Sequence, residues 1–368
     1  MSVYIYQLPN WPRFTWKQEQ IASVLSDVRH RQGKLIGRME GLGFNLQAEA
    51  NLETLTLEVI KTTEIEGEIL DAEEVRSSIA QKLGLNIAGV PSSDRHVEGI
   101  VEMMIDATNR CEEVLTTDRM FGWHAALFPA GRSGMHKIVT GAWRDNTKDD
   151  PMRVVSGAMG KEKIHFEAPE AARLNDEMNQ FTNWFNEDVV MDAVIKAAIA
   201  HLWFITIHPF DDGNGRIARA IADMQLGRAD GTAQRFYSMS AQIRKERKEY
   251  YDILETTQKG SLDITGWITW FLQCLGRALA ATDQTLGHVL NKARFWEKHT
   301  GTSLNARQRL MLNKLLDGFD GKLNTSKWAK IAKTSTDTAL RDIQDLIDKQ
   351  ILIKEASGGR STAYGIQL

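Results

Sequence analysis

Residues 208–219, HPFDDGNGRIAR, bring one histidine, two aspartates, a Gly-Asn-Gly and two arginines into twelve positions. The segment follows one apolar stretch and leads into another, which predicts a turn between two helices. Gly213, Asn214 and Gly215 can adopt the positive φ values that such a turn requires. Consecutive N–H groups at the start of the following helix form a nest for an anion, and the helix dipole adds to the attraction. We therefore expect a phosphate group to bind there.

The charged residues of this segment suit different tasks in phosphate chemistry. Arg216 and Arg219 are three residues apart on one helix face, where two guanidinium groups can hold different phosphates of one polyphosphate. Asp212 offers hard oxygen ligands of the kind that Mg²⁺ prefers. His208, with an ordinary pKa near ~6.5, is suited to accept a proton from a hydroxyl. Phe210 can anchor the loop in the core.

Each of these features also has a purely structural explanation. Gly-Asn-Gly after a helix is commonly a C-cap and turn, and Asp211 or Asp212 can cap the next helix. His208 alone fits a buried, hydrogen-bonded histidine, and paired arginines are often a solvated face. No capping or packing requirement accounts for the whole set, so the combination predicts a functional site.

The rest of the sequence predicts a mostly helical chain. Regularly spaced apolar residues predict helices over residues 15–41, 52–70, 97–115, 189–207 and 216–226, and two more within residues 247–280. Residues 131–169 are rich in glycine and contain two β-prone runs, MRVVSG and KIHF. The residues that join these runs include Ala158 and Gly160, which predicts a β-hairpin.

The C-terminal segment differs in charge from the rest of the chain. From residue 305 onward there are 11 Lys or Arg and 7 Asp or Glu, whereas the whole chain has a net charge of -3. Helices over 305–316, 326–333 and 339–349 followed by two strands, ILIKE and TAYGIQL, are the layout of a winged helix-turn-helix. In the expected recognition helix, 339–349, the aspartates at positions 342, 345 and 348 would face a phosphate backbone poorly. We therefore expect a protein-interaction or dimer-packing role for this segment in preference to DNA binding.

Length and composition are those of an ordinary soluble protein. The 368 residues suffice for two or three domains, and Cys111 and Cys274 lack the spacing of a disulfide framework or a zinc site. Neither a signal peptide nor an apolar run of about 18 residues is present. We expect a cytoplasmic protein without a membrane span.

HPFDDGNGRIAR resembles the signature of Fic proteins, His-x-Phe-x-(Asp/Glu)-Gly-Asn-Gly-Arg-x-x-Arg, and every specified position is filled. The resemblance implies transfer of AMP from ATP to a Ser, Thr or Tyr hydroxyl of a target protein, with release of pyrophosphate. It implies that His208 is the general base, Asp212 the Mg²⁺ ligand and Gly213 to Gly215 the phosphate cradle. Arg216 would contact the phosphates and Arg219 would hold the γ-phosphate.

The resemblance extends to the expected hairpin and to a later helix. GAWR at 141–144 and VVSG at 154–157 resemble the Fic flap, a hairpin that pairs with the backbone of the target. This places Val154, Val155, Ser156 and Gly157 beside ATP. YYDIL at 250–254 resembles the stretch that contacts adenine, which makes Tyr250 and Gln258 candidate ligands; relatives carry Asn at the latter position. For Tyr250 and Tyr251, simple helix packing is an equal alternative.

TTEIEGEIL, residues 62–70, resembles the inhibitory motif of the family, (Ser/Thr)-x-x-x-Glu-(Gly/Asn), with Thr62, Glu66 and Gly67 in place. The resemblance implies that Glu66 forms a bidentate ion pair with Arg219, so that ATP cannot be aimed for in-line attack. Without the resemblance, this stretch would be interpreted as an acidic helix end with Gly67 as its C-cap. The opening YIYQLPNWPRFTW resembles the N-terminal domain that precedes such cores.

Together these observations predict a mainly α protein with a Fic-type helical core, a β-hairpin flap and a C-terminal winged helix-turn-helix. We expect an N-terminal domain over 1–95, a catalytic core over 96–298 and a C-terminal domain over 299–368. The expected function is an autoinhibited adenylyltransferase that uses ATP and Mg²⁺. Two alternatives stay open, a DNA-binding regulator with a nucleotide-sensing pocket and removal of AMP by the same site. The sequence determines neither the target nor the oligomeric state, although relatives form homodimers.

Overall fold

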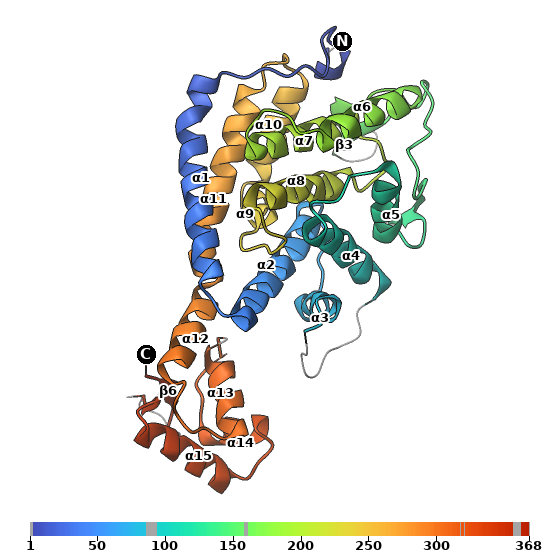
Figure 1. Ribbon diagram of the computed structural model, residues 1–368. Helices are drawn as coiled ribbons and strands as arrows, with labels where there is room; N and C mark the ends of the chain where they lie inside the picture. The colour runs from blue at the N-terminus through green and yellow to red at the C-terminus, as the bar shows by residue number, and fades with distance from the viewer. Residues whose placement is uncertain are drawn as a thin grey trace. The chain divides into compact units, whose positions relative to one another are not determined.

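The computed structural model describes residues 3–85, 94–157, 161–316, 318–319, 321–355 and 362–367. The chain is mainly α-helical, as predicted, and the strands in these ranges form three two-stranded antiparallel sheets (Figure 1). Contacts divide it into two compact units, Met1–Gly41 with Ala50–Thr282 and Leu42–Glu49 with Asp283–Leu368. No helix in the described ranges combines the length and the apolar character needed to cross a bilayer.

The first unit is built from helices that surround one buried pair. Its helices are η1 (Ile5–Gln7), α1 (Gln18–Glu40), most of α2 (Phe44–Ile65), α3 (Ala72–Lys82), α4 (Arg95–Asn109), α5 (Thr117–Leu127), η2 (Ala171–Arg173), α6 (Leu174–Asn186), α7 (Ala193–Ile207), α8 (Asn214–Asp230), α9 (Met239–Lys245), α10 (Arg247–Gln258) and α11 (Thr265–Thr285).

The central pair is α7 and α8, which pack against each other along their lengths (Figure 1). Every residue of α7 from Val194 to Ile207 is buried, because this helix is apolar on all its faces. Helices α1, α4 and α5 contact α8. The loop between α7 and α8, which carries the predicted site, is therefore held at both ends by the core of the unit.

Some helices differ from the predicted ones. Helix α2 begins at Phe44 and ends at Ile65, earlier than predicted at both ends, because Gly67 has a φ of +92° and terminates the helix. Helices α3, α5 and α6 were not predicted from the sequence. They are short, and α5 buries only Met120, Trp123, His124 and Leu127. Tertiary contacts with α4 and α8 stabilise it.

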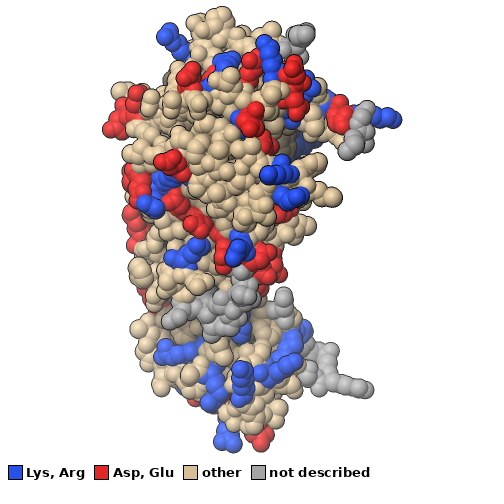
Figure 2. Space-filling model, turned by 90° about the vertical axis from the view of Figure 1, so that its right-hand side faces the viewer, with Lys and Arg blue, Asp and Glu red and all other residues tan. Residues whose placement is uncertain are grey.

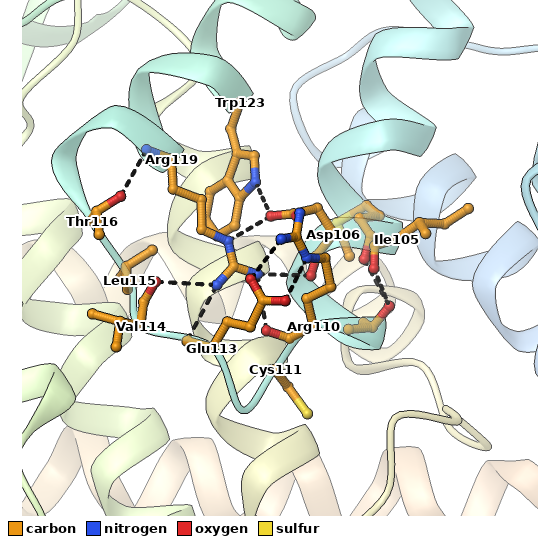
Figure 3. A network of polar contacts seen from close by, with 12 residues as sticks. Ile105, Asp106, Arg110, Cys111, Glu113, Val114, Leu115, Thr116, Arg119 and Trp123 are labelled. Atoms are coloured by element: carbon orange, nitrogen blue, oxygen red, sulfur yellow. Dashed lines mark hydrogen bonds and ion pairs between the residues drawn. The ribbon is translucent and has the colours of Figure 1, made fainter.

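A network of polar contacts fixes α5 on α4 (Figure 3). The Asp106 carboxylate accepts hydrogen bonds from Arg119 Nε at 2.6 Å and from Trp123 Nε1 at 2.7 Å. The same guanidinium donates to the carbonyl oxygens of Asp106 and Arg110 at the C-terminal end of α4. This network sets the position of α5, and Phe128 directly after it packs against the loop between α7 and α8.

The predicted hairpin is present. β3 (Arg153–Ser156) and β4 (Lys163–Glu167) pair antiparallel, with an irregularity in register between Val154 and Val155. The predicted connecting residues Ala158 and Gly160 lie outside the described residues. The hairpin rests on the aromatic side chains of Tyr4 and Tyr6, which pack around Phe166. A second, shorter pair consists of β1 (Arg132–Ser133) and β2 (His136–Lys137).

The second unit has the predicted order of three helices and two strands, preceded by one helix that was not predicted. It contains α12 (Gly287–Lys298), α13 (Ala306–Leu316), α14 (Thr325–Ile331), α15 (Thr336–Asp348), β5 (Leu352–Lys354) and β6 (Tyr364–Ile366). The strands β5 and β6 pair antiparallel. The unit begins before residue 299, because Phe295 of α12 belongs to the same apolar cluster as α13, α14 and α15. Its assignment as a winged helix-turn-helix stays a prediction.

The expected orientation of the aspartates on α15 was wrong for Asp342. This residue is buried, and its carboxylate accepts hydrogen bonds from Arg307 Nε at 2.7 Å and from Asn305 Nδ2 at 2.8 Å. Asp345 is also engaged, by Lys349 Nζ at 2.6 Å. A buried carboxylate requires such partners, and α13 supplies them on the inner face of α15.

Candidate functional site

A cavity of about 480 Å³ is lined by His208, Asp212, Asn214 and Gly215 of the predicted site, whereas Gly213, Arg216 and Arg219 are not among its lining residues. The loop after α7, the start of α8, the flap strands, helix α10 and Glu66 all contribute to its wall. Its lining residues are Glu66, Met152, Arg153, Val154, Val155, Ser156, His165, Phe166, Ile205, His208, Asp211, Asp212, Asn214, Gly215, Arg247, Tyr250, Tyr251, Leu254, Glu255 and Gln258.

Local hydrogen bonds hold the loop between α7 and α8 in a tight conformation. His208 caps α7 in the left-handed region, with φ 53° and ψ 57°, which is uncommon for a residue other than glycine. The Asn214 side chain accepts a hydrogen bond from Phe210 N at 3.0 Å and donates one to Phe210 O at 2.8 Å. Phe210 itself is fully buried, as its predicted anchoring role requires. The asparagine of Gly-Asn-Gly therefore closes the loop.

The imidazole of His208 is oriented for proton acceptance. Its Nδ1 lies 3.2 Å from the carbonyl oxygen of Ile205, so Nδ1 carries the proton and donates it to that oxygen. Nε2 is then the basic nitrogen, and the side chain lines the cavity. Burial lowers the pKa of His208 to about 4, so the imidazole is neutral near pH 7.

The two glycines of the motif are required for different contacts. Gly213 has a φ of +79°, and a Cβ there would lie 2.9 Å from Cε2 of Phe128. A Cβ on Gly215 would lie 2.3 Å from Oε1 of Glu66. The Glu66 carboxylate therefore lies against the N-terminus of α8, where its negative charge is favoured by the free N–H groups.

The ion pair between Glu66 and Arg219 is formed, but not in the bidentate geometry that we expected. Arg219 Nη2 donates to Glu66 Oε1 at 2.7 Å. Thr62 takes the remaining contacts: its hydroxyl oxygen accepts from Arg219 Nε at 2.7 Å and its carbonyl oxygen from Nη2 at 2.8 Å. The second Glu66 oxygen accepts from the Tyr251 hydroxyl at 3.4 Å. Thr62 occupies the Nε–Nη2 edge of the guanidinium, and on the Nη1–Nη2 edge a single oxygen of Glu66 reaches Nη2.

A second acidic residue of the same segment binds the other arginine. Glu68 Oε2 lies 3.2 Å from Arg216 Nη1, and Glu68 Oε1 lies 2.5 Å from His96 Nε2. The hydrogen bond between Glu68 and His96 raises the pKa of the imidazole and lowers that of the carboxyl. Sequence reasoning missed both residues, although the acidic run TTEIEGE contained the signal for Glu68.

Asp212 lies next to Gly213 just before α8, and its role as a Mg²⁺ ligand stays a prediction. One carboxylate oxygen accepts a hydrogen bond from the Ser133 hydroxyl and the other from Gly213 N at 2.6 Å. Asp211 and Asp212 both line the cavity. Within the described ranges, no cluster of three or more His, Cys, Asp or Glu forms a metal cage. This donor set fits Mg²⁺ bound by one carboxylate together with substrate phosphates and water.

The predicted adenine contacts differ in exposure. Tyr250 is among the lining residues, but it is only 1% exposed and its hydroxyl lies 2.9 Å from His201 Nε2, so it also packs between helices. Tyr251 is partly exposed at the cavity wall. Gln258 lines the cavity and donates to Thr206 Oγ1 at 3.3 Å.

Three of the four flap residues named from the sequence line the cavity, and their place beside ATP stays a prediction. Val154, Val155 and Ser156 line the cavity, whereas Gly157 is not among its lining residues and has a φ of +108°. Sequence reasoning assigned no role to His165, which joins the flap to α10 by a 2.6 Å contact with a carboxylate oxygen of Glu255. No motif in the sequence indicated that pair.

Arg144, the last residue of GAWR, ties the end of the flap to the loop between α7 and α8. Its guanidinium donates to His208 O at 2.8 Å and to Pro169 O at 2.6 Å, and its backbone N–H donates to Pro209 O at 2.9 Å. Burial lowers the pKa of Arg144 to about 10. The sequence signal was an arginine at the end of an otherwise apolar motif, and its structural role had not been predicted.

Two family profiles match the chain. Residues 114–226 match the Fic/DOC family, and residues 4–85 match a domain of unknown function, DUF4172. Among curated proteins, the chain is 34% identical over 104 residues to protein adenylyltransferase Fic of Culex quinquefasciatus, covering 28% of this chain and 19% of that protein. It is 27% identical over 245 residues to protein adenylyltransferase fic-1 of Caenorhabditis briggsae, covering 65% of this chain and 44% of that protein. The chain thus spans less than half the length of these two relatives.

Solved structures share the fold. A Fic family protein from Desulfovibrio desulfuricans aligns with a TM-score of 0.55 at 18% identity, covering 97% of this chain and 98% of that one. Fic-1 from Caenorhabditis elegans aligns with a TM-score of 0.50 at 19% identity, covering 75% of this chain and 76% of that one. At such identities the likeness establishes the fold alone.

Proposed function

Residues 114–226 belong to the Fic/DOC family, and from this premise we propose that the protein is an adenylyltransferase held inactive by Glu66. It transfers AMP from ATP to a Ser, Thr or Tyr hydroxyl of a target protein or of itself. The observation that carries the proposal is the Glu66 carboxylate lying on the phosphate cradle and paired with Arg219. The naming of curated relatives as protein adenylyltransferases supports it.

The transfer step assigns a role to each side of the cavity. Nε2 of His208 accepts the proton of the target hydroxyl, whose oxygen attacks the α-phosphorus of ATP. The bond from that phosphorus to the oxygen of the β-phosphate breaks, and pyrophosphate leaves. The N–H groups at the start of α8, together with Arg216 and Arg219, hold the β- and γ-phosphates. Asp212 would hold Mg²⁺, which neutralises phosphate charge when bound.

Inhibition follows from competition for the same contacts. Arg219 cannot bind a γ-phosphate through Nη2 while that nitrogen donates to Glu66 and Thr62. The Glu66 carboxylate also repels phosphate from the cradle, because both are anions. ATP that does bind is displaced from in-line geometry, which suppresses the rate of attack.

The flap offers a place for the target. Among the described strands, β3 pairs only with β4, so its other edge is available to a third strand. Val155 is exposed on this strand. An extended segment of the target can add to β3 through main-chain hydrogen bonds, with little demand on its sequence.

The test is labelling of the purified full chain, alone and with cell extract, by ATP carrying a radioactive α-phosphate in the presence of Mg²⁺. The wild type should label weakly and Glu66→Gly strongly, whereas Glu66→Gly combined with His208→Ala should not label. Glu64→Gly is the matched control, since Glu64 binds Lys61 and not Arg219. No gain of labelling by Glu66→Gly in a protein that still binds ATP would overturn the inhibitory role.

A DNA-binding regulator is the second candidate. The segment from α14 to α15 exposes the cations Lys327, Lys330, Lys333 and Arg341 together with the anions Asp337 and Asp348, whereas Asp342 is buried. Figure 2 shows more Lys and Arg than Asp and Glu on the drawn face of this unit. Tight, salt-dependent duplex binding, together with labelling that His208→Ala leaves unchanged, would favour this function.

Removal of AMP by the same site is the third candidate, with Glu66 aligning a water. The observation that favours it is the Glu66 carboxylate at the cavity wall, beside the basic His208. The test uses a purified target protein that carries AMP. The wild type should release AMP from it, and Glu66→Gly should abolish that release.

A further inference from the structure

Three side chains at the cavity wall form a continuous hydrogen-bond relay. A carboxylate oxygen of Glu255 lies 2.6 Å from His165 Nδ1, and His165 Nε2 lies 2.6 Å from the Ser156 hydroxyl oxygen. Ser156 and His165 come from the two flap strands and Glu255 from α10. All three line the same cavity as His208. The mechanism proposed above uses none of their hydrogen-bonding groups.

The charges around the relay fix its polarity. Although burial opposes ionisation, hydrogen bonds from Lys259 and His165 lower the pKa of Glu255 to about 2. The ionised carboxylate can only accept, so the imidazole proton is on Nδ1. In the tautomer that carries its proton on Nδ1, Nε2 is an acceptor, and the Ser156 hydroxyl donates to it. The lone pairs of Ser156 Oγ therefore face the cavity.

The relay lies away from the anion end of the cavity. Near its start, α10 contacts the end of α2: Arg247 Nε donates to Ile65 O at 2.7 Å, and the Tyr251 hydroxyl reaches Glu66. Glu255 follows Tyr251 by four residues, or about 6 Å along a helix axis. A nucleotide with its phosphates at the start of α8 would place its base at this end.

We propose that Ser156, positioned by His165 and Glu255, selects adenine by accepting a hydrogen bond from its exocyclic amine. Guanine and hypoxanthine carry an oxygen at that position, and two acceptors facing each other repel. This inference rests on the proposed use of a nucleoside triphosphate as substrate. It adds which residue selects the base of that nucleotide. His165 and Glu255 are positioning residues, since they act through the Ser156 hydroxyl.

The experiment compares ATP with ITP, whose base differs from adenine at that substituent, as labelling substrates of the full chain carrying Glu66→Gly. Adding Ser156→Ala should lower the ratio of kcat/KM for ATP to that for ITP about tenfold, because the hydrogen bond to the amine is lost. Ser156→Thr keeps the hydroxyl and should keep the ratio. His165→Ala frees the hydroxyl to donate to an oxygen, and should raise the rate with ITP.

Lys163→Ala is the matched control. Lys163 lies on the same flap strand, but its mostly exposed side chain lies 4.0 Å from Glu255, at the edge of ion-pair range. It should leave the ATP to ITP ratio unchanged. A ratio unaltered by Ser156→Ala, in protein that still labels, overturns the relay as a selector. Absence of labelling with either nucleotide in the Glu66→Gly protein would instead count against the proposed function.

Discussion

Thr62→Val should activate the protein, because Thr62 binds Arg219 as closely as Glu66 does. The substitution keeps the side-chain shape and removes the hydroxyl oxygen that accepts from Arg219 Nε at 2.7 Å. Thr62 is 0% exposed and Arg219 3%, so water cannot replace the lost acceptor. The Thr62 carbonyl still accepts from Nη2. The substitution therefore weakens the contacts that hold Arg219 in its inhibited position but does not remove all of them.

The expected size of the activation follows from the type of hydrogen bond that is lost. A hydrogen bond to a charged group contributes about 1.5–3 kcal/mol. The bond exists only while Arg219 lies on Thr62, so its loss destabilises the inhibited arrangement relative to the one that binds a γ-phosphate. This corresponds to a shift of roughly 10- to 150-fold in that equilibrium. The rate of labelling by ATP should rise accordingly, up to the level of Glu66→Gly.

The control is Thr63→Val, the same change at the next residue. Thr63 is equally buried, but its hydroxyl donates to Val59 O within its own helix and does not touch Arg219. Initial labelling rates of both variants, with melting temperatures to verify folding, decide the matter. If Thr62→Val labels no faster than Thr63→Val, then Thr62 contributes nothing to inhibition. In a Glu66→Gly background Thr62→Val should add little.

Three further predictions concern pH and the catalytic loop. The labelling rate of Glu66→Gly protein should stay level from pH 8 to pH 6 and fall only as pH approaches about 4, because burial lowers the pKa of His208 to about 4; a midpoint near 6.5 would contradict the buried base. Arg144→Met should lower the melting temperature and the labelling rate, since His208 O and Pro169 O lose their donor, at a cost of about 2–4 kcal/mol; unchanged melting would refute the bracing role. The hydrogen bond with Glu68 raises the pKa of His96, so the stabilisation that this pair contributes is complete below the ordinary imidazole pKa of ~6.5 and is lost as pH rises through the pKa of the folded protein. Glu68→Gln should return the NMR titration midpoint of His96 towards ~6.5.

The local pattern of the sequence determined the half of the candidate site that residues 208–219 form. In HPFDDGNGRIAR, the spacing of glycines and charges alone implied a turn, an anion nest, a base and two arginines, because these roles depend on residues adjacent in the chain. The helical spacing of apolar residues over 189–207 and the β-prone runs of the flap predicted the elements that hold them. The inhibitory role of TTEIEGE came from resemblance, and its pairing with Arg219 is present in the structure.

The tertiary structure decided the contacts between residues far apart in the chain. It replaced the expected bidentate pair with one shared between Thr62 and Glu66, and it lowered the pKa of His208 by burial. It also brought Glu255 to His165 and Arg144 to the His208 carbonyl, and turned Asp342 inward. Hydrogen-bond partners and desolvation depend on which segments pack together, and residue spacing along the chain carries no record of that packing.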